Sequence, residues 1–229
     1  MPRLYLGLGV QNTRKVGGAA PSSLLSGLLA YWNLNTNSWL DSTDAYPLIY
    51  SGTQVSTATG KIGNSASFNG SNYLYIDEFN ITTNCSFSFW FKSSVTSGVD
   101  LGVGVVDVAG ESYVGGFRIL SINGVIYFQA PSEAVANSID SYCDGTFHHV
   151  VGTADGSTIR IYIDGSFKQA NNTDLGEVSL IDMAIGSVGD ALAQSGTQID
   201  EVGVWNRALS QAEITSLYNA GAGKTYPFN

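Results

Sequence analysis

A strand that runs directly into a capped helix, close to the C-terminus, constrains this sequence most strongly. In residues 199–205 two valines alternate with glycine and tryptophan, and both faces of the segment are largely apolar. This pattern predicts a strand that is covered on both sides. Ser210 and Glu213 have the spacing of a capping box, which predicts a helix over residues 210–219. A helix this short must dock on a folded surface, and we expect it on the rim of a sheet.

Strand signals recur at short intervals along the rest of the chain. Residues 86–91 alternate, with three phenylalanines on one face and Trp90 on the other. Asn123-Gly124 separates two apolar runs and favours a type I′ hairpin turn. Many short strands and one late short helix predict a two-sheet antiparallel sandwich. Trp90 fits either a core position where the sheets meet or a platform for a ligand.

Length and composition agree with one domain of this class. The chain has 229 residues, of which 44% are hydrophobic and 13% charged, enough apolar surface for a sizeable core. The formal net charge of −9 argues against nucleic acid as a partner, because phosphate binding requires a basic surface. No apolar run approaches the ~20 residues of a membrane span. Cys85 and Cys143 are either two free thiols or one disulfide.

Residues 1–26 differ from the rest of the chain, since they hold three of its ten basic residues and no acid. Residues 17–23 are rich in Gly, Ala, Pro and Ser and indicate a linker. The segment is either an unstructured tail or an arm that docks on a partner. An arm could add a strand to an exposed sheet edge and be attracted to an acidic neighbour. Its candidate docking residues are Arg3, Leu4, Leu6, Leu8, Val10, Arg14 and Lys15.

Two pairs of adjacent polar residues invite a chemical interpretation. His148-His149 contains the only two histidines. Neighbours on a strand point to opposite faces, so the two rings are not expected to bind one metal together. By the same rule, the side chains of Asp200 and Glu201 are expected on opposite faces. We expect structural, hydrogen-bonded roles for both histidines.

Five stretches, in order, resemble laminin-G-like jelly rolls of the concanavalin A-like lectin/glucanase superfamily. They are GLLAYWNLN from Gly27, SASFNGSNYLYI from Ser65, SFSFWFKSS from Ser86, FHHVVGTADGSTIRIYIDG from Phe147 and IDEVGVWNRALSQAEITSLYN from Ile199. The resemblance implies an all-β fold, a two-sheet antiparallel jelly-roll sandwich with one short C-terminal helix and an extended N-terminal arm. The expected organisation is a docking arm and linker over residues 1–26 and a laminin-G-like domain over residues 27–229.

The superfamily includes glucanases, which need paired carboxylates at a spacing near Glu-x-Asp-x-x-Glu. Asp107 and Glu111 come nearest to that pattern, but Val105 stands where the leading acid would be. The two carboxyl groups of a retaining enzyme must lie about 5–5.5 Å apart. We therefore expect no enzymatic activity.

The resemblance also implies a Ca²⁺ site on the rim of the sandwich. Its candidate ligands in this chain are Asp41 and Asp200. Calcium takes six to eight oxygen ligands, so scattered loop acids can serve together with backbone carbonyls. The alternative is that both acids are solvated or hydrogen-bonded within the protein.

Glycan binding by such a domain would use aromatic side chains in its loops or on its concave sheet. Tyrosine and tryptophan also build cores and protein interfaces, so the residue type alone does not decide. The candidates that we expect to face a glycan are Trp39, Tyr46, Tyr73 and Tyr113.

Residues 6–23, LGLGVQNTRKVGGAAPSS, resemble the heads of bacteriophage structural proteins in which a short arm precedes a lectin-like domain. This favours a non-enzymatic virion surface protein, a capsid decoration or a tail or fibre component. Its expected partners are other virion structural proteins, bound through the arm, surface glycans and further copies of the same chain. A secreted or cell-surface carbohydrate-binding module is the second reading, and a glycoside hydrolase is the third.

Overall fold

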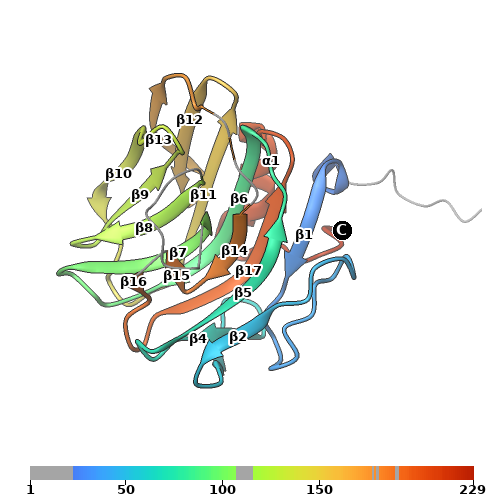
Figure 1. Ribbon diagram of the computed structural model, residues 1–229, viewed down its shortest axis with the longest axis vertical. Helices are drawn as coiled ribbons and strands as arrows, with labels where there is room; N and C mark the ends of the chain where they lie inside the picture. The colour runs from blue at the N-terminus through green and yellow to red at the C-terminus, as the bar shows by residue number, and fades with distance from the viewer. Residues whose placement is uncertain (1–22, 107–115, 177, 179–180, 189–190) are drawn as a thin grey trace, which may run out of the picture.

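The computed structural model describes residues 23–106, 116–176, 178, 181–188 and 191–229, which form two antiparallel sheets packed on each other (Figure 1). The first sheet has the order β13-β12-β11-β6-β17-β4-β3, and β1 also pairs with β17. Its strands are β1 (Leu28–Trp32), β3 (Ser56–Thr59), β4 (Asn64–Ser67), β6 (Asn84–Lys92), β11 (His148–Asp155), β12 (Thr158–Ile163), β13 (Ser166–Asn172) and β17 (Gln198–Trp205). The predicted sandwich is confirmed.

The second sheet has the order β10-β9-β8-β7-β14-β5-β2. Its strands are β2 (Ile49–Gly52), β5 (Asn72–Phe79), β7 (Val99–Val106), β8 (Arg118–Ile122), β9 (Val125–Gln129), β10 (Val135–Ser141) and β14 (Ile181–Ile185). The short strands β15 (Ser187–Val188) and β16 (Ala191–Leu192) pair with each other. No helix in the part of the chain that the structure describes is long and apolar enough to cross a membrane.

The main core lies between the two sheets, and the alternation in β6 explains it. Phe87, Phe89 and Phe91 are at most 2% exposed and belong to this core. The Phe87 ring lies 6.3 Å, centroid to centroid, from the rings of both Phe117 and Phe128. A period-two pattern therefore sends one row of phenylalanines inward, as predicted.

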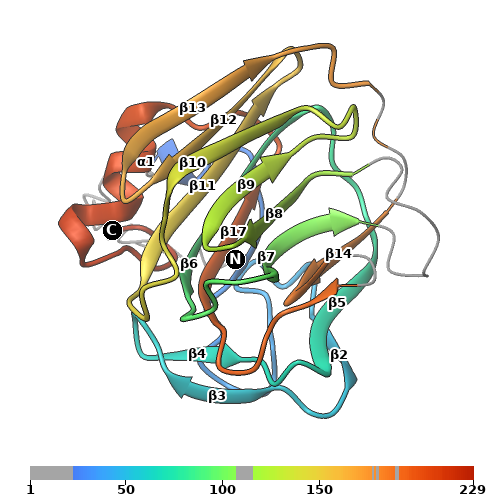
Figure 2. The same ribbon diagram turned by 90° about the vertical axis from the view of Figure 1, so that its left-hand side faces the viewer.

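A second cluster covers the outer face of the first sheet. It joins residues of the sheet, such as Trp205, to helix α1 (Gln211–Tyr218) and to Phe228 near the C-terminus. Figure 2 shows α1 and the C-terminal segment on the side of the first sheet away from the second. The expected position of the helix on the rim is therefore wrong, because Ile214 and Leu217 need apolar cover that the sheet face supplies.

The ends of α1 follow the sequence signals. The Ser210 side chain accepts from the Glu213 N–H, the Glu213 carboxylate accepts from the Ser210 N–H, and Asn219 ends the helix in the left-handed region. Asn123 and Gly124 both have positive φ, at 51° and 85°. This is the type I′ geometry predicted for the turn between β8 and β9.

The N-terminal end of the described chain is packed, not free. Residues Ser23–Leu25 form the 3-10 helix η1, and Leu24 is 1% exposed in the outer cluster. The Arg207 guanidinium donates to the carbonyls of Ser23 and Ser26, at 2.8 and 2.7 Å. Residues 23–26, which were expected to belong to the arm and linker, therefore contact the sandwich through Leu24 and Arg207.

Candidate functional site

A pocket of roughly 300 Å³ opens in the loop of residues 33–44, which leads from β1 toward β2. Trp39 and two leucines supply its apolar wall. Its polar lining comes from Asn33, Asn35, Thr36, Ser38, Asp41, Ser42 and Asp44. Ligand pockets commonly combine apolar walls with a few converging polar groups, so this loop is the candidate site.

The backbone of the loop is held in a costly conformation. Leu34, Trp39 and Asp44 have φ values of 53°, 49° and 61°. Side chains other than glycine rarely take the left-handed region, and each such residue costs about 1–3 kcal/mol. Such residues persist only where the surrounding contacts determine the conformation, and they gather at functional sites.

Asp41 supplies most of those contacts. Its side chain is buried, and Oδ1 accepts from the backbone N–H groups of Tyr31 and Thr43 at 2.8 and 3.0 Å. Oδ2 accepts from the N–H groups of Ala45 and Tyr46 at 3.1 and 3.0 Å, and also from the Thr43 hydroxyl. One carboxylate thus ties the end of β1 to both sides of the loop.

Asn35 is the second anchor of the loop. Its Oδ1 accepts from the backbone N–H of Asn64, the first residue of β4, at 2.6 Å, and its carbonyl accepts from the Asn64 side chain at 3.1 Å. Gly63 has a φ of 68°, and a Cβ there would lie 2.2 Å from Asn35 Oδ1. Glycine at position 63 therefore allows the close approach that holds the pocket wall against the sheet.

Trp39 is a buried residue of the pocket whose indole N–H makes no hydrogen bond among the described residues. It is 3% exposed, and its carbonyl accepts from the N–H of Leu48 at 3.1 Å. The indole Nε1–H has no hydrogen-bond partner among the described residues. A buried donor without an acceptor costs about 1–3 kcal/mol, so this N–H is a group that an acceptor oxygen would stabilise.

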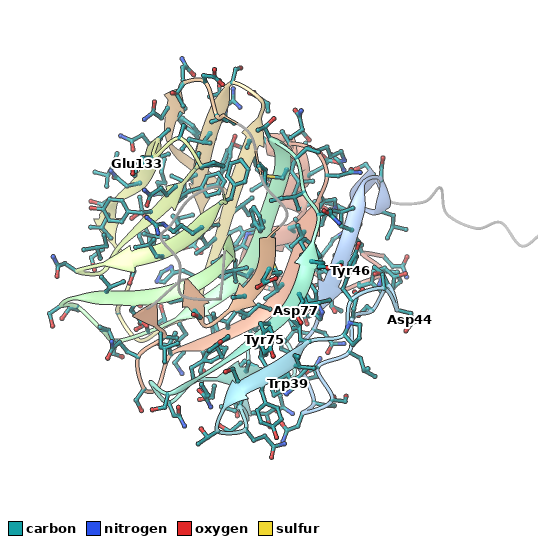
Figure 3. The ribbon with its side chains drawn as sticks, viewed as in Figure 1. Trp39, Asp44, Tyr46, Tyr75, Asp77 and Glu133 are labelled. Atoms are coloured by element: carbon teal, nitrogen blue, oxygen red, sulfur yellow. The ribbon has the colours of Figure 1, made fainter. Side chains whose placement is uncertain are left out.

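The other predicted glycan-facing residues are not among those that line the pocket, or lie outside the described residues. Tyr46 is partly buried, with its ring 4.8 Å from that of Phe79. Tyr73 and Tyr75 lie on the same face of β5, with ring centroids 5.7 Å apart, and Figure 3 shows Tyr75 and Asp77 on that strand. Tyr113 lies outside the described residues, so its expected role stays a prediction.

The predicted arm and the residues weighed for hydrolysis cannot be placed. All seven candidate docking residues lie outside the described residues, because the description begins at Ser23. Asp107 and Glu111 fall in the undescribed stretch of residues 107–115. The docking role of the arm stays a prediction.

Asp200 and Glu201 correct one expectation from the sequence. Glu201 has a φ of 52°, and the pairing of β17 with β6 shifts register between Asp200 and Gly203. This bulge breaks the alternation and brings both side chains to the outer face. Asp200 there lies opposite Trp90, and Glu201 accepts from the Tyr31 hydroxyl.

The electrostatics of this pair follow from burial. Both residues are at most 3% exposed. Asp200 Oδ2 accepts from the N–H groups of Lys61 and Ile62, whereas Asp200 Oδ1 and Glu201 Oε1 have no partner among the described residues. Burial raises the pKa of both carboxyls to about 7, and the charge of Asp200 adds to the shift of Glu201. The pair lies under the C-terminal segment, where a polysaccharide cannot reach it.

The two acids expected to bind calcium do not offer equal ligands. The five donors around Asp41 use both of its oxygens, whereas Asp200 keeps one oxygen free. No group of three or more His, Cys, Asp or Glu side chains suited to a metal occurs among the residues that the structure describes. Asp41 therefore does not fit a calcium site.

The histidines and cysteines have structural surroundings. His148 lies between Asp164 and Asp144, whose hydrogen bonds raise its pKa. His149 is buried against Ser88 and Trp90, and burial lowers its pKa to about 4. Cys85 and Cys143 are buried free thiols.

Trp90 is neither in the main core nor an open platform, since it is 2% exposed and stacks on Tyr218 of α1.

Comparison with known proteins agrees with the fold. Residues 68–215 match a model of the concanavalin A-like lectin/glucanases superfamily, which is well over half of the chain. This chain belongs to that superfamily. No curated protein matches it.

Solved structures of the superfamily's fold are similar at low identity. Domain 4 of AbnA, a GH43 extracellular arabinanase from Geobacillus stearothermophilus solved with arabinotriose, is 19% identical, with a TM-score of 0.69 over 86% of this chain and 98% of that one. The binding domain of Paraclostridial Mosquitocidal Protein 1 is 16% identical, with a TM-score of 0.65 over 85% of this chain and 52% of that one. The binding domain of botulinum neurotoxin D, solved with N-acetylneuraminic acid, is 18% identical, with a TM-score of 0.63 over 84% and 50%. This chain thus spans about half the length of the toxin binding domains.

The sequence singled out Trp39 but missed the amides and hydroxyls around it. A signal was present in residues 33–38, where three asparagines, a threonine and a serine lie close together before Trp39. Polar residues of this kind between two strands indicate a loop. A polar loop that also contains a tryptophan could have been predicted to form a ligand-binding site.

Proposed function

We propose that this protein is a non-enzymatic carbohydrate-binding module and that the loop of residues 33–44 holds the sugar. The observation that carries the proposal is a preorganised pocket lined by Trp39, whose buried indole N–H has no acceptor among the described residues. Preorganised loops lose little entropy on binding. Similar structures were solved with arabinotriose and with N-acetylneuraminic acid, and cell entry of botulinum neurotoxin type C depends on interaction with gangliosides, which supports a sugar as the ligand here.

The test is glycan binding by the full chain and by Trp39→Phe. Phenylalanine keeps most of the ring but removes the N–H donor, so we expect at least tenfold weaker binding on a glycan array and by calorimetry. Phe167→Ala, at an exposed aromatic on β13, is the matched control and should bind as the parent does. Thermal melting checks that both variants fold. Equal binding by Trp39→Phe would place the site elsewhere.

We further propose that the module is displayed on a virion by residues 1–22, with a secreted or cell-surface module as the alternative. The basic, alternating composition of that segment and the acidic charge of the whole chain support an arm that docks on a partner. Deletion of residues 2–20 should leave the melting temperature unchanged, because Leu24 and the Arg207 contacts are retained. The truncated chain should fail to attach to particles that lack the protein. Its attachment to them would show that the docking surface is in the sandwich.

A non-catalytic role also makes a direct prediction. Incubation with β-glucans or arabinans should release no new reducing ends. Release that is lost in Asp107→Asn or Glu111→Gln would instead support the glycoside hydrolase reading.

A further inference from the structure

The charge of the pocket lining restricts which sugars can enter it. Asp41 and Asp44 are its only ionisable residues, and no Lys, Arg or His is among the lining residues. Asp41 uses both oxygens inside the loop, so it contributes negative charge but no open acceptor. Asp44 is exposed, and among the described residues its carboxylate has no hydrogen bond or ion pair.

Two groups on pocket-lining residues that have no hydrogen bond among the described residues are the buried indole N–H of Trp39, a donor, and the exposed carboxylate of Asp44, an acceptor. A sugar hydroxyl can accept from the first or donate to the second, and an ammonium group can pair with the second. A carboxylate on the ligand can only accept, and it would face two fixed negative charges in a partly desolvated site.

The size of the pocket limits how much of a glycan it holds. A volume of roughly 300 Å³ corresponds to about ten water molecules at ~30 Å³ each. A single furanose or pyranose ring fits within that volume, whereas a trisaccharide does not. The rest of a longer glycan would lie outside the loop.

We infer that the pocket takes one neutral or amino sugar ring, at a chain end or branch, and excludes acidic sugars. This inference rests on the proposed function. It would distinguish this protein from the neurotoxin domain solved with N-acetylneuraminic acid, because two carboxylates and no basic side chain line the site here. Uronic acids and sialic acid are expected to bind at least tenfold more weakly than their neutral counterparts.

The experiment uses sugars that share a ring and differ in charge. Binding of glucose, glucosamine and glucuronate, and of galactose, galactosamine and galacturonate, is measured by ligand-observed NMR with the full chain. Sialylated and unsialylated glycans on an array are compared in parallel. We expect the neutral and amino sugars to bind, the amino sugar preference to fall with added salt, and the acids to give no signal.

Two variants assign the selectivity to the pocket. Asp44→Asn should abolish the preference for amino over neutral sugars, and Asp44→Lys should raise binding of the uronates by at least tenfold. Asp140→Lys makes the same charge change at an exposed acid of β10 and should leave selectivity unchanged.

The possible failures are distinguishable. Acidic sugars that bind best, with binding lost in Trp39→Phe, would overturn the charge inference and leave the proposed function standing. Binding of neutral sugars that neither Trp39→Phe nor Asp44→Lys affects would overturn both. No binding of any sugar would overturn the proposed function itself.

Discussion

The loop around Asp41 and the bulge at Asp200 and Glu201 bury carboxyl groups in opposite ways. Asp41 meets five donors, four of them backbone N–H groups, and both of its oxygens are used. Asp200 and Glu201 share one face, and each keeps an oxygen without a partner among the described residues. A buried carboxylate is stable where donors surround it, and where they do not, the group tends to hold its proton. The comparison shows that burial alone does not identify a site.

The largest effect is expected from Asp41→Ala. Loss of the carboxylate leaves several buried N–H groups without an acceptor, so we expect the free energy of unfolding to fall by about 3–5 kcal/mol. Urea denaturation measures it. Asp41→Asn keeps one acceptor oxygen and should lose less. A loss below about 1 kcal/mol would mean that the loop does not depend on this residue.

The second effect concerns pH. The pKa values of Asp200 and Glu201 are raised to about 7 in the folded state, so folding takes up protons and their stabilising contribution is complete below the ordinary carboxyl pKa of about 4. That contribution is lost as pH rises toward 7. The double variant Asp200→Asn, Glu201→Gln should therefore gain about 1–3 kcal/mol relative to the parent between pH 5 and pH 8.

Denaturation of the parent and the double variant across that pH range provides the comparison. Asp140→Asn, at an exposed acid of β10, serves as the control and should track the parent. Parallel curves for the double variant and the parent would show that the two carboxyls are ionised in the folded protein at pH 5.

A third carboxylate, Glu213, sharpens the comparison because an arginine satisfies it. Arg207 donates to both of its oxygens at 2.9 and 2.7 Å, and this hydrogen bonding lowers the pKa of Glu213 to about 2. Arg207→Lys loses the two-pronged contact and the bonds to Ser23 and Ser26, so we expect a loss of about 1–2 kcal/mol by thermal melting. An unchanged melting temperature would mean that the hydrogen bonds from Arg207 to Ser23, Ser26 and Glu213 do not contribute to stability.

The smallest effect is expected from Thr43→Val, which removes one of the five donors to Asp41 and keeps the side-chain shape. We expect a loss of about 1 kcal/mol in urea. Thr36→Val, at an exposed hydroxyl of the same loop, is the matched control. A loss as large as that of Asp41→Ala would mean that the five donors act as one unit.

The sequence predicted those parts of the fold that depend on local patterns. The phenylalanine alternation in β6, the Asn123-Gly124 turn and the capping box of Ser210 each have a short-range cause, and each is confirmed. Trp39 was named as a candidate from its residue type, and the structure places it in the pocket.

The remaining features depend on contacts between distant residues. Nothing local places η1 under Arg207, which lies 181 positions from Ser26. In the sequence, the segment around Glu201 looks like an ordinary alternating strand. The bulge that turns the Glu201 side chain to the same face as Asp200 could therefore not be predicted. Asp41 carries no local sign that five donors will surround it, and its interpretation as a metal ligand followed from the resemblance alone.

The packing of η1 has a mechanical consequence. A pull on the chain ahead of Ser23 is resisted first at Leu24 and the Arg207 contacts, and then along β1, whose one strand partner among the described residues is β17. Strand β1 leads directly into the loop of residues 33–44. If the protein is anchored through its N-terminal segment and holds a surface by this loop, tension between anchor and ligand travels along β1. Under such tension the backbone hydrogen bonds between β1 and β17 would break first, so these few bonds set the force that the protein resists.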